Sequence, residues 1–158
     1  MPDNLFAKLL KQGRLKKQKA GIVQIEALLK QAMIDLAEAK KISHIAERAT
    51  YLLAYMAMLK AGRALLLFKG YVPDDGAQHK TVVEATSVFL GEKYRNLTEQ
   101  FESMRRKRNE MTYEAGALLS MSESQKAFAD AISLVKEITK EVKSQNPQLE
   151  LVFDIENR

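Results

Sequence analysis

The sequence has few of the residues that define several large classes of protein. It contains no cysteine and no tryptophan, and only two histidines, three prolines and seven glycines in 158 residues. The lack of cysteine excludes disulfides and thiolate metal sites within this chain and suits a reducing cytoplasm, where we expect the protein. The scarcity of proline and glycine leaves long stretches that a helix can occupy without interruption. The composition therefore favours an all-α fold.

Long hydrophobic runs and metal-binding motifs are missing too. The most apolar stretch, residues 49 to 68, is interrupted by Lys60 and Arg63, so no charge-free run approaches the roughly 20 residues that span a bilayer. His44 and His79 belong to no metal-binding spacing such as H-E-x-x-H, and no glycine-rich phosphate loop follows a strand. We therefore expect no membrane partner, no metal site and no cofactor.

Helical periodicity is what the sequence does have. Apolar residues recur at steps of three and four over residues 22 to 41 and again over residues 128 to 142, a spacing typical of one face of a helix. Residues 44 to 69 are apolar on most sides, which predicts the central helix of the fold. Ser43 is the expected N-cap of that helix, and Gly70 is its expected stop.

The second half of the chain predicts three further helices. After a loop at residues 71 to 76, a short helix is expected over about residues 81 to 90 and a long one over residues 92 to 119. Ser122 with Gln125 three residues later resembles a capping box that begins the last helix. Together these segments predict an antiparallel bundle of four long helices with one short additional helix.

We divide the chain into a basic N-terminal helical arm at residues 1–20, the helical bundle at residues 21–145 and a C-terminal tail at residues 146–158. Residues 5 to 19 carry six basic residues and no acidic one. Such a segment could contact a phosphate backbone or a membrane surface, or be a solvated helical extension packed on the bundle. The tail is apolar and partly alternating, so it could be an extended segment that docks on the body or on a partner.

The helix predicted at residues 92 to 119 carries an arginine within its apolar stripe. Arg108 follows Phe101 and Met104 at helical spacing, and Arg105, Asn109 and Tyr113 lie on the border of the same stripe. A guanidinium beside an apolar seam needs a carboxylate, a partner chain or a ligand phosphate.

Two interpretations of Arg108 follow from its place in the stripe. It could snorkel to the surface or pair with an acid on a facing helix, such as Glu47 or Asp35. It could equally bind phosphate, with Asn109 orienting the bound group.

Several segments in a fixed order resemble the HEPN domain family. They are residues 54 to 66 in the central helix, Gly70-Tyr71, residues 79 to 83, and then residues 105 to 109 with Tyr113. The resemblance covers nearly the whole predicted bundle. It implies a bundle of four to five helices that forms a homodimer through the helix bearing Arg108, so that two copies of an Arg-polar-x-x-x-His motif meet in a cleft.

The resemblance also implies what the motif residues do. Many HEPN domains are metal-independent endoribonucleases of toxin–antitoxin or other defence systems, in which the histidine assists attack of the ribose 2′-hydroxyl and the arginine stabilises the transition state. Arg108 and Asn109 match the first two motif positions, and Tyr113 stands where the family has histidine. We therefore expect Arg108, Asn109 and Tyr113 to be the catalytic residues and Arg105 and Arg108 to bind the phosphate.

Because Tyr113 stands at the histidine position, more than one function is compatible with the sequence. A phenol with a pKa near 10 is a poor general base at pH 7, although it can donate a hydrogen bond to phosphate. One hypothesis is an RNA-binding protein or endoribonuclease. A second is a non-catalytic HEPN module that partners a minimal nucleotidyltransferase, and a third is a structural bundle whose partner is chosen by the basic arm. His79, which follows the predicted loop, is expected to cap or fix the next helix.

Overall fold

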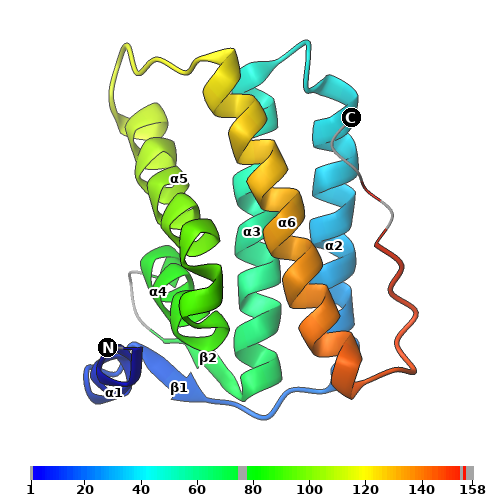
Figure 1. Cartoon of the computed structure of the whole chain (residues 1–158). Helices are drawn as coiled ribbons and strands as arrows, with labels where there is room; N and C mark the ends of the chain where they lie inside the picture. Colours follow the sequence, from blue (N-terminus) through cyan, green and yellow to red (C-terminus); the bar gives the residue numbers. More distant parts are fainter. Residues whose placement is uncertain (1, 75–77, 154, 156–158) are drawn as a thin grey trace.

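The computed structural model describes residues 2–74, 78–153 and 155, and in this part of the chain it is an α-helical protein with one small sheet (Figure 1). The elements in order are α1 (Pro2–Lys11), β1 (Leu15–Lys17), α2 (Ile22–Ile42), α3 (Glu47–Lys69), β2 (Tyr71–Pro73), α4 (Gln78–Leu90), the 3₁₀ turn η1 (Glu92–Tyr94), α5 (Arg95–Tyr113) and α6 (Met121–Gln145). The expectation of a predominantly helical fold is confirmed.

The apolar helix α3 is at the centre, as its sequence predicts. It packs against α2, α4, α5 and α6, and Figure 1 shows it lying between α2 and α5 and behind α6. By length and composition α3 could cross a membrane, with a mean hydropathy of 1.4, but 67% of that window is buried inside the protein. Its apolar surface is therefore covered by the neighbouring helices, which form the hydrophobic core around it.

The helices on either side bury the stripes that the sequence predicts. In α2 the residues at helical spacing from Ile25 to Ala39 are buried, and in α6 those from Phe128 to Val142 are buried. The tail after α6 also contributes to the core, because Leu149 and Leu151 are buried and Lys143 donates a hydrogen bond to the carbonyl of Leu151. The tail thus docks on the body of the protein, and Figure 1 shows it running beside α2.

The N-terminal segment departs from the predicted helical arm. Its helix α1 ends at Lys11, and Gly13 adopts a positive φ of 69° that turns the chain into strand β1. Strand β1 pairs antiparallel with β2, with Leu15 opposite Pro73 and Lys17 opposite Tyr71. The prediction of a plain loop at residues 71 to 76 was therefore wrong for residues 71 to 73, because a strand partner far away in the sequence satisfies their backbone groups; residues 75 and 76 lie outside the described part of the chain.

Three predicted helix boundaries are also wrong. Ser43 does not cap α3: its hydroxyl donates to the carbonyl of Lys40 at 3.1 Å, in the last turn of α2. The helix α4 begins at Gln78 rather than residue 81. The capping box of α6 consists of Ser120 and Glu123 instead of Ser122 and Gln125, and both of its hydrogen bonds are formed. A pair of polar residues two positions earlier caps α6, whereas the N-cap of α3 is Ala46, whose side chain makes no capping hydrogen bond.

The arginine-bearing helix is shorter than predicted. A 3₁₀ turn replaces its first residues, and α5 ends at Tyr113, after which Gly116 adopts a positive φ of 82°. Leu118 therefore lies beyond the helix and is not part of its stripe. The segment after α5 turns back toward the helix, where the Lys107 ammonium donates a hydrogen bond to the carbonyl of Leu118.

Candidate functional site

Arg108 is partly buried on α5, and neither of the acids considered as its partner binds it. Asp35 pairs with Lys60 at 2.7 Å, across the contact between α2 and α3. Glu47 begins α3, and its backbone carbonyl accepts a hydrogen bond from Ser124. Within residues 2–74, 78–153 and 155, the Arg108 guanidinium makes no ion pair and no hydrogen bond with another side chain. Its five donors are therefore available to a ligand.

The other residues proposed from the sequence have different surroundings. Arg105 is held by Glu102, with 2.6 Å between its Nε and a carboxylate oxygen, and this hydrogen bond raises the pKa of Arg105. Asn109 is partly buried beside Arg108 in the sequence. Tyr113 is the last residue of α5 and is 80% exposed. The site that the sequence proposes is therefore divided between a partly buried arginine pair and a solvent-exposed tyrosine.

A buried tyrosine and a histidine that sequence analysis did not connect lie near these arginines. The hydroxyl of Tyr55 on α3 is 3.0 Å from Nδ1 of His79, in the first turn of α4, and the two ring centroids are 5.8 Å apart. Tyr55 also packs against Phe101 of α5, at 6.0 Å between ring centroids. The pair therefore occupies the place where α3, α4 and α5 meet.

Gly62 allows α4 to approach α3 closely enough for this pair to form. A Cβ atom at residue 62 would be only 2.8 Å from Cγ1 of Val82 and 2.8 Å from Oγ1 of Thr86, both on α4. Such separations are shorter than ordinary van der Waals contact, so a residue larger than glycine requires a shift of α4 or a rotation of these two side chains. The close contact between the helices sets the position of His79 against Tyr55.

The electrostatics of the pair favour neutral forms of both side chains. Burial lowers the pKa of His79, and the charges of Arg108, Arg63 and Arg105 lower it further. Burial raises the pKa of Tyr55 to about 12, against the opposing effect of the same arginines. At pH 7 the imidazole is therefore uncharged and the phenol keeps its proton.

We name the five residues that share this environment the basic corner: Tyr55, Arg63, His79, Arg105 and Arg108. Glu102 offsets part of the charge, because it binds Arg105, and it also acts on Tyr55. Among the residues that the structure describes, Arg63 makes only a long hydrogen bond of 3.5 Å, to the side-chain oxygen of Gln78. Guanidinium groups that are not committed to carboxylates suit phosphate oxygens, and a neutral imidazole can accept or donate a proton.

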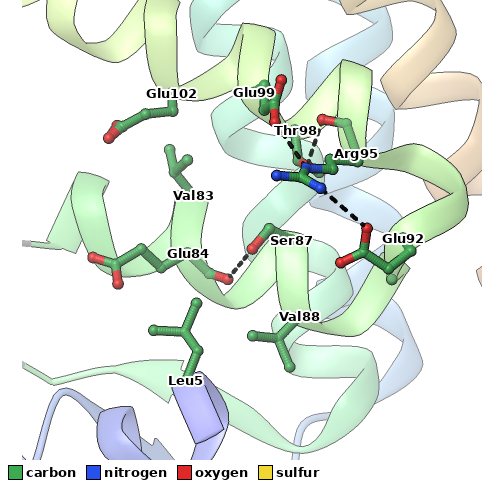
Figure 2. A pocket seen from close by; sticks show the side chains of 11 residues that line it. Leu5, Val83, Glu84, Ser87, Val88, Glu92, Arg95, Thr98, Glu99 and Glu102 are labelled. Atoms are coloured by element: carbon green, nitrogen blue, oxygen red, sulfur yellow. Dashed lines mark hydrogen bonds and ion pairs between the residues drawn. The ribbon is translucent and has the colours of Figure 1, made fainter. Parts of the chain in front are cut away.

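An acidic hollow lies on the other side of Glu102. It has a volume of about 540 Å³ and lies between α4 and α5, with Leu5 of α1 at its lower edge (Figure 2). Its carboxylates come from Glu84, Glu92, Glu99 and Glu102, and Arg95 binds two of them, with Nε 2.9 Å from Glu99. The other two carboxylates are also paired with arginines, Glu84 with Arg14 at 2.9 Å and Glu102 with Arg105 at 2.6 Å.

The described residues contain no group of three or more histidine, aspartate or glutamate side chains arranged to hold a metal ion. The polar groups available for chemistry at the basic corner are thus guanidinium, imidazole and phenol.

The sequence analysis proposed Arg105 and Arg108 but did not connect them with Tyr55, Arg63 and His79. Tyr55 and Arg63 lie eight residues apart on an apolar helix, where they read as interruptions of a core pattern. His79 was assigned to capping or fixing a helix start, and it does lie in the first turn of α4. Nothing in the local sequence indicates that α4 brings this histidine to a tyrosine 24 residues earlier.

Comparison with known proteins gives no family assignment. No protein-family model matches the chain, and no curated protein and no solved structure matches it either.

Proposed function

We propose that this protein is an RNA-binding protein of the HEPN type and acts as a metal-independent endoribonuclease. The observation that carries the proposal is the place of His79, bonded to Tyr55 and close enough for the charge of Arg108 to lower its pKa, while the Arg108 guanidinium has no ion-pair partner among the residues described. In this proposal His79 takes the place of the motif histidine, where the sequence has Tyr113. In this proposal the acid–base role belongs to His79, and Tyr113, exposed at the end of α5, has no part in the chemistry.

The reaction follows from the groups at the basic corner. Arg108 binds the non-bridging oxygens of an RNA phosphate and stabilises the charge that develops on them. The ribose 2′-oxygen forms a bond to phosphorus as its proton passes to Nε2 of His79. The bond from phosphorus to the 5′-oxygen breaks, and that oxygen takes up a proton from water as it leaves. The products are a 2′,3′-cyclic phosphate and a 5′-hydroxyl.

Tyr55 orients the histidine. Its hydroxyl bonds Nδ1 of the imidazole, which fixes the plane of the ring and leaves Nε2 to face the substrate. Proton acceptance at Nε2 requires the tautomer in which Nδ1 carries the hydrogen and donates it to the Tyr55 oxygen. Arg105 is held by Glu102 and acts through its charge, as a secondary contribution to phosphate binding.

The proposal includes a homodimer formed through the helix that bears Arg108. Its support is a group of exposed apolar side chains at the end of α5 and in the segment that follows: Tyr113 at 80%, Leu118 at 82% and Met121 at 45% exposed. Tyr113 ends α5 and Met121 begins α6, so these exposed apolar side chains belong to the connection between the two helices, and exposed apolar surface is typical of a protein interface. Light scattering should give twice the 17.9 kDa chain mass, and Leu118→Glu should lower it to that of one chain.

A second candidate function is a non-catalytic module that partners a minimal nucleotidyltransferase in the cytoplasm. The same exposed apolar group favours it, because the surface could be covered by a different protein. A toxin–antitoxin or other defence system would suit either candidate. The two differ in whether the basic corner breaks RNA.

The deciding experiment is cleavage of a mixed single-stranded RNA pool in EDTA. Wild type should produce 2′,3′-cyclic phosphate ends, and Arg108→Ala and His79→Gln should each lower the rate by about 100-fold or more. Arg95→Ala is the matched control, because it removes the same charge from the same helix about 20 Å away along its axis. Tyr113→Phe should cleave at the wild-type rate.

The outcomes separate the candidates. Full activity in His79→Gln would overturn the proposed base, and loss in Tyr113→Phe would return that role to the tyrosine. If folded, dimeric wild type binds the RNA pool but leaves it intact, the endoribonuclease is excluded and the partner module is the function to pursue.

A further inference from the structure

A second groove adjoins the basic corner and has the opposite character to the acidic hollow. Its volume is about 420 Å³, and α2, α3, β2 and the start of α4 form its walls. The apolar part of the lining consists of Ala27, Leu28, Leu67, Val72 and Pro73. A groove of this size is within the range of roughly 300–1,000 Å³ that small-molecule sites have.

Amide side chains surround this apolar floor. Gln24 and Gln31 are seven residues apart on α2, about 10 Å along its axis, and Gln78 faces them from the first turn of α4. A primary amide both donates and accepts hydrogen bonds, which is the combination that base edges require. Arg63 is the one charged side chain among the described residues that line the groove.

Arg63 connects the groove with the basic corner. It lines the groove and bonds Gln78, and its charge also reaches His79. Gln78 and His79 are neighbours in the sequence, and each belongs to one of the two sites. A ligand that has a flat, partly polar ring and a phosphate a short distance from it would therefore occupy both at once.

An exposed lysine lies beside another wall of the groove. Lys16 of β1 is the register partner of Val72 of β2, which lines the groove, and the side chains of paired residues project from the same face of a sheet. Lys17 pairs with Tyr71 and projects from the opposite face. Positive charge from Arg63 and Lys16 thus lies on two sides of an uncharged floor, an arrangement that suits phosphates next to one base.

We propose that this groove holds one nucleobase of an RNA chain whose adjacent phosphate lies at the basic corner. The assignment rests on the proposed RNA binding and adds to it a site for base recognition. The base packs on the aliphatic floor and its edge hydrogen-bonds to the glutamines. The groove then determines which phosphate of the chain is presented to Arg108.

Ala27→Phe tests the groove without a change of charge, because it adds a ring to an exposed residue of the lining. Ala37→Phe is the matched control, since Ala37 is exposed on the same helix and does not line the groove. The probes are labelled RNA pentamers, one with bases and one of abasic ribose phosphate. Binding is followed by fluorescence anisotropy, with circular dichroism as the check that each variant folds.

Wild type and Ala37→Phe should bind the pentamer with bases about fivefold or more tightly than the abasic one. Ala27→Phe should lose this preference and keep the wild-type affinity for the abasic chain. Equal binding of the two pentamers by wild type, or a preference that survives in Ala27→Phe, would overturn the base site. A mononucleotide that binds as tightly as the pentamer would overturn the assignment to an RNA chain.

Failure of the proposed function is recognised separately. If wild type binds neither pentamer, the proposed RNA binding is wrong. Nucleosides without phosphate then test whether the groove still binds a base. Shifts in the side-chain amide signals of Gln24 and Gln31 on addition of adenosine or uridine, absent in Ala27→Phe, would support a base site. No shift in the wild-type protein would overturn it.

Discussion

Replacement of Gly62 by alanine tests how the fold positions the basic corner. The new Cβ would be 2.8 Å from Cγ1 of Val82 and from Oγ1 of Thr86, and Phe101 is next at 3.6 Å. Carbon atoms in contact normally lie about 3.5–4.0 Å apart, so α4 must move away from α3 or its side chains must rotate. The hydroxyl of Thr86 is buried without a hydrogen-bond partner among the residues described, so rotation of this side chain breaks no hydrogen bond.

Two effects of opposite sign determine how much Gly62→Ala changes the free energy of unfolding. Alanine in the middle of a helix is favoured over glycine by about 1 kcal/mol. Extra volume in a packed core costs about 1–3 kcal/mol. Because two separate atoms are crowded, we expect the second effect to win by about 1 kcal/mol, which for a chain of this size lowers the melting temperature by roughly 2–4 °C.

The same substitution should disturb the site. A shift of α4 by a few tenths of an ångström would lengthen the 3.0 Å contact between Tyr55 and His79 and expose the imidazole to water. Since burial is the main cause of the low pKa of His79, that pKa should rise toward its ordinary value of about 6.5 in Gly62→Ala. The RNA-cleaving activity, where present, should fall more than the stability does.

Urea unfolding followed by circular dichroism measures the first effect, and an NMR titration of the imidazole measures the second. Gly21→Ala is the control for added volume, because nothing lies within 4 Å of a Cβ at that position; as Gly21 is the N-cap of α2, the change in stability of this variant reports the cap alone, and the pKa of His79 should be unchanged. Thr86→Ala combined with Gly62→Ala should be less destabilising than the sum of the two single changes, since it makes room for the new methyl group. A Gly62→Ala protein as stable as wild type, with an unchanged pKa of His79, would refute the close-approach argument.

Three further predictions concern the helix cap and the buried pair. Ser120→Ala should lower the free energy of unfolding by about 1 kcal/mol because it removes the cap of α6, and Ser122→Ala should leave it within about 0.5 kcal/mol, both measured in urea. The pKa of His79 is lowered, so the unfolded chain takes up a proton below about pH 6.5 that the folded chain does not, and this contribution to stability is lost as the pH falls. Arg108→Ala should raise that pKa in an NMR titration, and an unchanged value would show that the charges are too far apart to interact. The pKa of Tyr55 is raised to about 12, so its phenol should stay protonated at pH 11, as ultraviolet difference absorbance against Tyr55→Phe would show; ionisation near pH 10 would contradict its burial.

The predictions from sequence agree best with the structure where the apolar face of a single helix determines which residues are buried. The stripes of α2 and α6 are buried as predicted. Apolar residues at steps of three and four lie on one face of a helix, and that face packs against the core. The central place of α3 follows in the same way from its apolar surface on most sides. Gly70 ends α3 with a positive φ of 93°, a conformation that glycine adopts without strain.

The predictions that failed depend on choices between local alternatives. Ser120 caps α6 two positions before the predicted Ser122, and α3 begins after Ala46 without a side-chain cap, so the preference of serine for capping positions does not fix where either helix begins. The strand pair of β1 and β2 joins segments more than fifty residues apart, so no local pattern announces it. The early end of α5 reflects the turn at Gly116, which helical periodicity alone did not indicate.

The amino-acid sequence by itself determined that the chain is helical, which faces of its helices are buried, and that Arg108 interrupts an apolar stripe. Only the tertiary structure decided that Tyr55 and His79 meet, because they come from different helices whose separation is set by the missing side chain of Gly62. It also decided that Asp35 binds Lys60 instead of Arg108. Periodicity records which way a side chain faces along its own helix, whereas a site depends on which helices pack together and how closely.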